Sequence, residues 1–209
     1  MTTGRRRRLA IFTRYPEPGT TKTRLVPALG PDGAADLQRR MTERTLDRMR
    51  DLSRPGEPRV DLEIRTSGGT PSSFARWLGP GRSFVDQGAG DLGARMLRTF
   101  EDATREGFHA TVIIGVDAPE LSSTHVREAF DRLARGELAL GPAEDGGYYL
   151  IGATRPMPAL FADMPWGTGS VLATTLDRAR GLGLEAHLLE TLRDVDRPED
   201  LRTWHAATD

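Results

Sequence analysis

The single lysine of this chain, Lys22, lies among residue types that can hold a phosphate. It is the only lysine among 29 lysines and arginines, and residues 15–25 around it read Tyr-Pro-Glu-Pro-Gly-Thr-Thr-Lys-Thr-Arg-Leu. An ammonium on a flexible stem can follow a phosphate that moves, whereas a planar guanidinium prefers a fixed, forked partner. We expect Lys22 to be an exposed loop cation that contacts nucleotide phosphate, beside Arg14, Gly19 and Arg24, so that its removal weakens nucleotide binding without harming the fold. A solvated basic turn would have the same composition, and a P-loop is excluded because a threonine, not a glycine, precedes the lysine.

Three aspartates stand where carboxylates could bind a cation. Asp117 follows an apolar run that ends in Ile-Ile-Gly-Val, and carboxylates at the carboxyl edge of a parallel sheet lie where α/β folds bind ligands. Asp194 and Asp196 project to the same side of an extended segment, which allows one of them to meet a cation. We expect Asp117 and Asp196 to converge on one divalent cation, with oxygens within roughly 5 Å of each other. The alternatives that need no ligand are a turn residue at 117 and a helix start at 196.

Residues 140–152 combine a turn signature with groups that could contact a substrate. The sequence Asp-Gly-Gly at 145–147 is typical of a hairpin. The same residues, with adjacent carboxylates, little side-chain bulk and two tyrosines, also describe the floor of a substrate site, and a tryptophan downstream could stack on a sugar or a base. We expect the second substrate to be bound by Asp145, Gly146, Gly147, Tyr148 and Trp166. A plain hairpin and a core tryptophan are the alternative.

Residues 87–95, Gln-Gly-Ala-Gly-Asp-Leu-Gly-Ala-Arg, match the G-x-G-x-x-G pattern of dinucleotide-binding proteins. The run before them is a poor buried strand, and the carboxylate of Asp91 would repel a pyrophosphate at the start of the following helix. We expect Asp91 to cap that helix, and the loop to line the nucleotide pocket through Gln87, Gly88 and Gly90. An NAD-linked oxidoreductase that uses Gly88, Gly90 and Gly93 is a less favoured alternative.

Short apolar runs alternate with longer amphipathic stretches, which favours a mostly parallel sheet covered by helices on both faces. The expected strands are residues 9–13, 60–66, 83–86, 110–115, 138–141, 148–153 and 185–189. The expected helices are residues 32–52, 91–105, 122–135 and 170–181, with a short one from 198. Since residues 148–153 follow the preceding strand after a short turn, one antiparallel or edge strand is expected. Loops are expected at 53–58 and 67–73, and a single domain over residues 1–209, of which 1–8 form a disordered basic tail.

Composition excludes several classes of protein. The formal net charge is −1 with 28% charged residues, so a nucleic-acid partner is not expected. The sequence has no cysteine, which excludes disulfides and thiolate chemistry. The apolar run after the arginines at 5–8 is far shorter than a secretory signal of roughly 7–15 apolar residues or a membrane span of roughly 20. A cytoplasmic protein is expected, and the four histidines are scattered without ligand spacing.

Taken in order along the chain, these segments resemble the GT-A superfamily of nucleotide-dependent transferases. They are most similar to a bacterial family of GT-A-type glycosyltransferases, also described as radical-SAM/selenodomain-associated transferases and linked to arsenosugar formation. The matching segments, which together span nearly the whole chain, are residues 16–25, 87–96, 115–119, 141–152 and 194–201. The resemblance implies a single-domain GT-A-like fold (nucleotide-diphospho-sugar transferase), an α/β three-layer sandwich with a mostly parallel central sheet.

A weaker resemblance links the same segments to sugar-acid cytidylyltransferases and phospholactate guanylyltransferases. It implies that Lys22 and Arg24 bind phosphate and that Asp117 and Asp196 bind metal. One departure concerns the reaction: many GT-A glycosyltransferases carry Asp-x-Asp at the end of the central strand, and this chain has Asp-Ala-Pro from residue 117. Nucleotidyl transfer therefore remains a strong alternative to glycosyl transfer.

These observations predict a transferase in which Lys22, Arg24, Asp117 and Asp145 are catalytic. Mg²⁺ or Mn²⁺ is the expected metal, because phosphates and carboxylates offer hard oxygen ligands. The leading hypothesis is glycosyl transfer from an NDP-sugar to a small-molecule acceptor, and the alternative is nucleotidyl transfer from an NTP to a phosphorylated small molecule. A non-catalytic nucleotide sensor is a further alternative, and a homodimer is left open.

Overall fold

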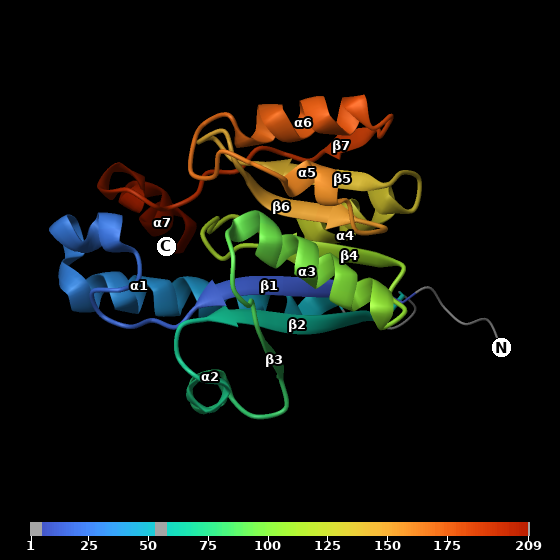
Figure 1. The fold of residues 1–209 in the computed structure, drawn as a ribbon. Helices are drawn as coiled ribbons and strands as arrows, with labels where there is room; N and C mark the ends of the chain where they lie inside the picture. The colour runs from blue at the N-terminus through green and yellow to red at the C-terminus, as the bar shows by residue number, and fades with distance from the viewer. Residues whose placement is uncertain (1–5, 53–57, 209) are drawn as a thin grey trace.

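A seven-stranded sheet forms the centre of the protein (Figure 1), in a computed structural model that describes residues 6–52 and 58–208. The strand order is β3-β2-β1-β4-β6-β5-β7. All neighbouring strands run parallel except β6, which is antiparallel to both of its neighbours. The strands are β1 (Arg7–Arg14), β2 (Val60–Ser67), β3 (Ser83–Asp86), β4 (Ala110–Ile114), β5 (Leu138–Pro142), β6 (Tyr148–Ala153) and β7 (Ala186–Leu188).

Helices cover both faces of the sheet, so the molecule has three layers (Figure 1). The helices are α1 (Val26–Arg48), α2 (Pro71–Leu78), α3 (Leu92–Arg105), α4 (Ser123–Leu133), α5 (Pro158–Phe161), α6 (Val171–Gly181) and α7 (Leu201–Thr208). α3, α5 and α6 share one hydrophobic core with the sheet, and α1 and α4 share another on the opposite face. The predicted α/β class, a three-layer sandwich with a mostly parallel central sheet, is confirmed. No helix in the described ranges is long and apolar enough to cross a membrane.

The central strands are apolar on both faces because both faces are covered. In β1, Leu9 and Ile11 pack into the core shared with α1 and α4, whereas Ala10 packs into the core shared with α3. Leu9, Ala10 and Ile11 have no exposed surface. This buried strand delivers its carboxyl end, and the loop that follows, to the edge of the sheet next to β4.

The antiparallel strand β6 lies inside the sheet, between β4 and β5. A turn at residues 143–147 joins it to β5, with Gly146 N donating to Ala143 O at 3.0 Å and Ala143 N donating to Gly147 O at 3.0 Å. The expected antiparallel strand is therefore confirmed as an interior strand. Its direction places the turn at the same edge of the sheet as the carboxyl ends of β1 and β4.

The segment after β7 returns across this edge. Val195 N donates to Asp117 O at 2.8 Å, and Val195 is fully buried in a third core cluster that includes Leu25 and Trp204. This cluster packs the first turns of α1 against α7. It fixes residues 192–196 beside the loop that follows β1.

The structure corrects three sequence expectations. Residues 67–73 were expected to be a loop, but α2 begins at Pro71, held by a capping box between Thr70 and Ser73 and by the fully buried Phe74. The helix expected from residue 32 begins at Val26, with a non-helical break at Gly30 (φ 71°), and ends at Arg48.

The expected basic tail is also shorter than predicted, because β1 begins at Arg7. The Arg8 side chain is 8% exposed and forms ion pairs with Glu63 at 3.2 Å and Glu106 at 2.6 Å. Buried charges are tolerated only when they are paired, so this arginine belongs to the folded domain. The first five residues of the expected tail, and most of the expected loop at 53–58, lie outside the described residues.

Candidate active site

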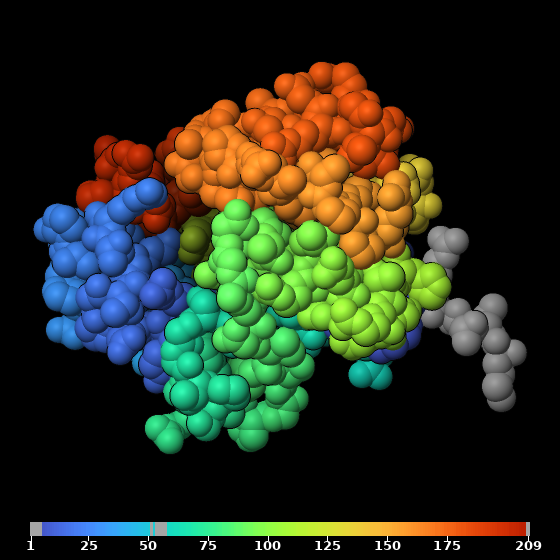
Figure 2. Space-filling model, in the orientation of Figure 1, coloured from blue at the N-terminus to red at the C-terminus, as the bar shows by residue number. Residues whose placement is uncertain are grey.

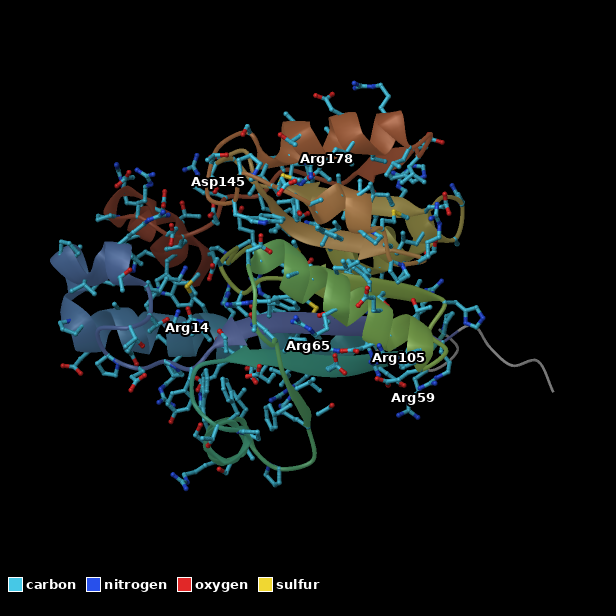
Figure 3. The ribbon with its side chains drawn as sticks, viewed as in Figure 1. Arg14, Arg59, Arg65, Arg105, Asp145 and Arg178 are labelled. Atoms are coloured by element: carbon cyan, nitrogen blue, oxygen red, sulfur yellow. The ribbon has the colours of Figure 1, made fainter. Side chains whose placement is uncertain are left out.

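A cleft of about 670 Å³ opens at the edge of the sheet where β1 and β4 end. It is lined by the ends of these strands, the loop after β1, the start of β6 and the segments around residues 166 and 194. Figure 2 shows a hollow among the blue N-terminal loop, the green segment that begins α3 and the orange segment that precedes α6. Figure 3 shows Arg14 and Asp145 at this end of the molecule, away from Arg59 and Arg105.

Lys22 lines the cleft but is not the exposed cation that was expected. Its side chain is 4% exposed, and Nζ lies 2.9 Å from Asp117 Oδ1. Nζ also donates to Val195 O at 2.6 Å. The backbone of Lys22 is left-handed (φ 46°), a conformation that costs a non-glycine residue energy. Residues 192–196 cover the loop, and that is the reason for the burial.

The two other predicted cations of the loop are exposed. Arg24 pairs with Asp196, and both line the cleft. Arg14, at the carboxyl end of β1, lines the cleft without an ion-pair partner in the described ranges. Gly19 turns the loop with φ 77° but does not line the cleft. The cleft therefore has one basic wall, made by a single loop and the end of one strand.

Four aspartates line the cleft: Asp117, Asp145, Asp194 and Asp196. Asp117 and Asp196 lie at the basic wall, paired with Lys22 and Arg24, whereas Asp145 and Asp194, which have no ion-pair partner in the described ranges, make the acidic side of the cleft. Burial, followed by the negative charges of Asp145 and Asp117, raises the pKa of Asp194 to about 6, and nearby Lys22 opposes this shift only in part. The mutual effect shows that these carboxylates lie close enough to repel one another. Asp194 and Asp196 were predicted to offer one ligand to a cation, and Asp196 was the one chosen. The Asp-x-Asp spacing was the signal that could have identified Asp194.

The described residues contain no group of three or more acidic, histidine or cysteine side chains already arranged to hold a metal ion. Asp117 and Asp196 each have a basic partner instead. Carboxylates are the ligand type that a hard divalent cation prefers, so the chemistry of these side chains, though not their arrangement in this structure, suits such an ion. Both predicted metal ligands lie in the cleft.

The glycine-rich segment borders the cleft through Gln87 and Leu92 and not through its glycines. Gln87 lines the cleft and its Nε2 donates to Thr13 O at 3.3 Å and Arg65 O at 3.0 Å, so it ties the ends of β1 and β2 together. Gly88 and Gly90, expected to bind nucleotide, do not line the cleft. Arg98 fills the space behind Gly88, where an added Cβ would lie 2.5 Å from its Nη1. The φ of 79° at Gly88 favours glycine there.

Asp91 caps α3 as expected, with Oδ1 accepting from Ala94 N at 2.8 Å. Gly93, the last glycine of the pattern, lies against Trp166, whose Cζ2 would be 2.8 Å from an added Cβ. The glycines of this segment therefore serve close packing around α3. Nothing in this arrangement points to a dinucleotide.

Four of the five predicted substrate-binding residues line the cleft, namely Asp145, Gly147, Tyr148 and Trp166, whereas Gly146 does not. The Tyr148 and Trp166 rings meet edge to face, 6.5 Å between centroids. Asp145 Oδ1 accepts from Gly147 N at 2.8 Å, which makes the expected turn. Gly146 (φ 86°) packs on the backbone of Gly169, whose oxygen would lie 2.1 Å from an added Cβ. This backbone contact fixes the turn that carries Asp145 against the segment that carries Trp166.

The fold is that of the nucleotide-diphospho-sugar transferases. A crystal structure of a candidate nucleotide-diphospho-sugar transferase from Desulfovibrio desulfuricans G20 is 35% identical, with a TM-score of 0.88, over 95% of this chain and 85% of that one. This similarity confirms the expected transferase class. The chain belongs to the family described as "Uncharacterized protein conserved in bacteria (DUF2064)", whose model matches residues 45–168.

More distant structures share the fold alone. CMP:2-keto-3-deoxy-manno-octonic acid synthetase in complex with CTP is 13% identical with a TM-score of 0.53, over 96% of this chain and 97% of that one. Glucosyl-3-phosphoglycerate synthase from Mycobacterium tuberculosis, in complex with Mn²⁺, UDP and its product, is 14% identical with a TM-score of 0.53, over 95% and 75%. Among curated proteins, none is similar enough to count as a match.

Proposed function

We propose that this protein is a metal-dependent transferase that moves a glycosyl group from an NDP-sugar to a small-molecule acceptor. The observation that carries the proposal is the meeting of Lys22 and Asp117, one from the loop after β1 and one from the end of β4, in a cleft with one basic and one acidic side. A sugar nucleotide carries a diphosphate that needs cations and a sugar that needs hydrogen-bonding groups. The two sides offer these two environments.

Arg14, Lys22 and Arg24 are the residues for the diphosphate. Negative charge grows on the diphosphate as the bond to the sugar breaks, and fixed positive groups beside it lower the barrier. Arg14 is free to take this role, whereas Lys22 and Arg24 must first leave their aspartate partners. Incoming phosphates supply the replacement charge for both.

Asp117, with Asp194 or Asp196, is the set that would hold Mg²⁺ or Mn²⁺, and the bound ion would neutralise phosphate charge. Asp145 lies at the acidic side of the cleft. Its Oδ1 accepts the turn hydrogen bond, and its Oδ2 has no hydrogen-bond partner among the described residues. We assign it to the acceptor hydroxyl, whose proton it can receive as the new bond to the sugar forms.

Nucleotidyl transfer from an NTP is the second candidate. It is favoured by the Asp-Ala-Pro sequence at the end of β4, which differs from the Asp-x-Asp of many GT-A glycosyltransferases. The CTP complex of one fold neighbour also favours it. The same basic side of the cleft would then hold a triphosphate.

A panel of NTPs and NDP-sugars, with and without Mg²⁺ or Mn²⁺, tests the proposal by thermal stabilisation and product analysis. We expect metal-dependent stabilisation by at least one NDP-sugar, and its loss in Asp117→Asn. Asp131→Asn, at an exposed position of α4 away from the cleft, is the matched control. Stabilisation by NTPs alone would support the second candidate, and stabilisation by NADH alone would contradict both.

A further inference from the structure

The acidic side of the cleft has a wall that we call the acceptor wall: Asp145, Tyr148, Trp166, Thr168 and Asp194. It is made by the turn before β6, the start of β6, the segment before α6 and the segment after β7. No lysine, arginine or histidine from residues 143–196 of the described chain lines the cleft. All basic residues of the cleft come from the loop and strand end at 14–24.

The arginines near the acceptor wall are engaged elsewhere. Arg178 donates to the carbonyl oxygens of Leu160 and Ala162, the first at 3.3 Å. Arg193 pairs with Glu144 at 2.7 Å. If one of these arginines turned into the cleft, it would lose these bonds. Within the described ranges, the acceptor wall therefore has no arginine nearby that is free to pair with an anionic ligand.

The acceptor wall also carries an apolar surface with two buried polar atoms, Tyr148 Oη and Trp166 Nε1, that have no hydrogen-bond partner among the described residues. The Tyr148 and Trp166 rings form its aromatic part. Buried donors are normally satisfied, and an indole N–H can only donate. A neutral oxygen from a ligand would meet this need.

We propose that the acceptor is an uncharged or positively charged hydroxyl compound with an apolar face, and not a phosphate or a carboxylate. This inference rests on the proposed function and narrows its acceptor. An anion placed on the wall would be repelled by Asp145 and Asp194, and the repulsion is strong where water is partly excluded. The nearby cation is Lys22, which is already paired with Asp117. The apolar face of a sugar ring or an aromatic ring would pack on Trp166.

The assignment separates this chain from a fold neighbour and from the second candidate function. One structure of glucosyl-3-phosphoglycerate synthase holds phosphoglyceric acid, an anionic molecule. An NTP-dependent enzyme that acts on a phosphorylated substrate also needs a cation at its acceptor. The acceptor wall offers neither compound a basic partner.

The test uses the full chain labelled with 5-fluorotryptophan, with the Trp166 resonance assigned from Trp166→Phe. The probes are four matched sugars: methyl glucoside (neutral), glucosamine (cationic), glucuronate and glucose 6-phosphate (anionic). We expect the first two to shift the Trp166 resonance at concentrations at least about tenfold lower than the last two. An equal or stronger response to the anionic sugars would overturn the proposal, as would the absence of a response to all four.

Two substitutions at Asp145 sharpen the result. Asp145→Asn can keep the turn hydrogen bond to Gly147 and should weaken the preference for glucosamine, and Asp145→Lys should create a response to glucose 6-phosphate. Asp131→Lys on α4 should change neither. If Asp145→Lys fails to fold, Asp145→Asn alone decides, and an unchanged charge preference in it would overturn the proposal.

The two proposals can fail separately. Nucleotide binding is read from thermal stabilisation, and acceptor binding is read from the Trp166 resonance. A protein that shows the expected charge preference but binds no nucleotide would refute the transferase and keep the ligand class. A protein that binds NDP-sugar but prefers anionic sugars would keep the transferase proposal and refute the proposed ligand class.

Discussion

Lys22 Nζ lies 2.9 Å from Asp117 Oδ1, so the only lysine of the chain neutralises the carboxylate at the end of β4. The lysine side chain is 4% exposed and the aspartate side chain 48% exposed. The ammonium therefore stands at the place where the proposed divalent cation would share Asp117. The loop after β1, the end of β4 and the segment at residues 192–196 meet at this ion pair.

The first prediction concerns stability. Lys22→Met should lower the free energy of unfolding by about 1–3 kcal/mol, because the Val195 carbonyl and Asp117 both lose a charged partner. Urea denaturation measures the change. Arg24→Met is the matched control, since the Arg24 side chain is 59% exposed and an exposed pair is worth about 1 kcal/mol or less. Equal losses in both variants would show that burial of Lys22 adds nothing.

The second prediction concerns competition between Lys22 and the metal. In the absence of nucleotide, Lys22→Met should bind Mn²⁺ about tenfold more tightly than the wild type, because an ammonium no longer occupies Asp117. In the presence of nucleotide the same variant should lose affinity for the nucleotide. Electron paramagnetic resonance of free Mn²⁺ gives the first value, and calorimetry the second. Weaker Mn²⁺ binding in the variant would rule out the competition.

The third prediction concerns pH. The pKa of Asp194 is raised from 3.8 to about 6 in the folded protein, first by burial and then by Asp145 and Asp117. A raised carboxyl pKa stabilises the fold below the unfolded value and loses that contribution as pH rises through the folded value. Asp194→Asn removes this loss, so without metal the variant should be more stable than the wild type at pH 7.5 by roughly 1–2 kcal/mol after allowance for solvent.

Chemical denaturation at pH 4 and pH 7.5 measures this difference between Asp194→Asn and the wild type. The gain in stability of the variant should grow between these two pH values, and Asp131→Asn should show no such growth. Addition of Mg²⁺ should favour the wild type and reduce the gap. A gap that is the same at both pH values would contradict the assignment of the shift to Asp194.

The fourth prediction concerns the turn that carries Asp145. Gly146→Ala should destabilise the protein by more than Gly167→Ala, because only the first Cβ would meet backbone atoms. Both glycines have positive φ, 86° and 77°, so the cost of the left-handed backbone, about 1 kcal/mol, is common to both. The excess for Gly146 isolates the contact with Gly169. Equal melting temperatures of the Gly146→Ala and Gly167→Ala variants would show that the backbone at Gly169 moves to accommodate the added Cβ at little cost.

Much of the fold could be predicted because local patterns and tertiary packing agree. The strands at 83–86 and 148–153 have the predicted bounds, since each is bounded by Gly or Asp turn residues. Helix α2 was missed although Thr70 and Pro71 give it a local start signal, because the segment is short and rich in glycine and serine. It begins Pro-Ser-Ser after two glycines, and its stability comes from Phe74, which packs against Tyr15 and Trp77.

The site could be predicted only in part. The predicted cations Lys22 and Arg24 and the four aspartates line one cleft, because all follow strand ends or turns that the sheet brings to one edge. The burial of Lys22 depends on the carbonyl of Val195, 173 residues away. The role of Asp194 depends on its distance from Asp145 and Asp117. No local pattern encodes either contact.

The return of residues 192–196 across the sheet edge has a consequence for the order in which this protein becomes functional. The loop that holds Lys22 and the strand that ends before Asp117 are made early on the ribosome. They remain without the Val195 contacts until synthesis has passed β7. A nascent chain that has folded β1 to β6 therefore already contains the sheet but holds Lys22 uncovered. Competence for the proposed reaction would then arise in a late step, when the returning segment closes over the loop.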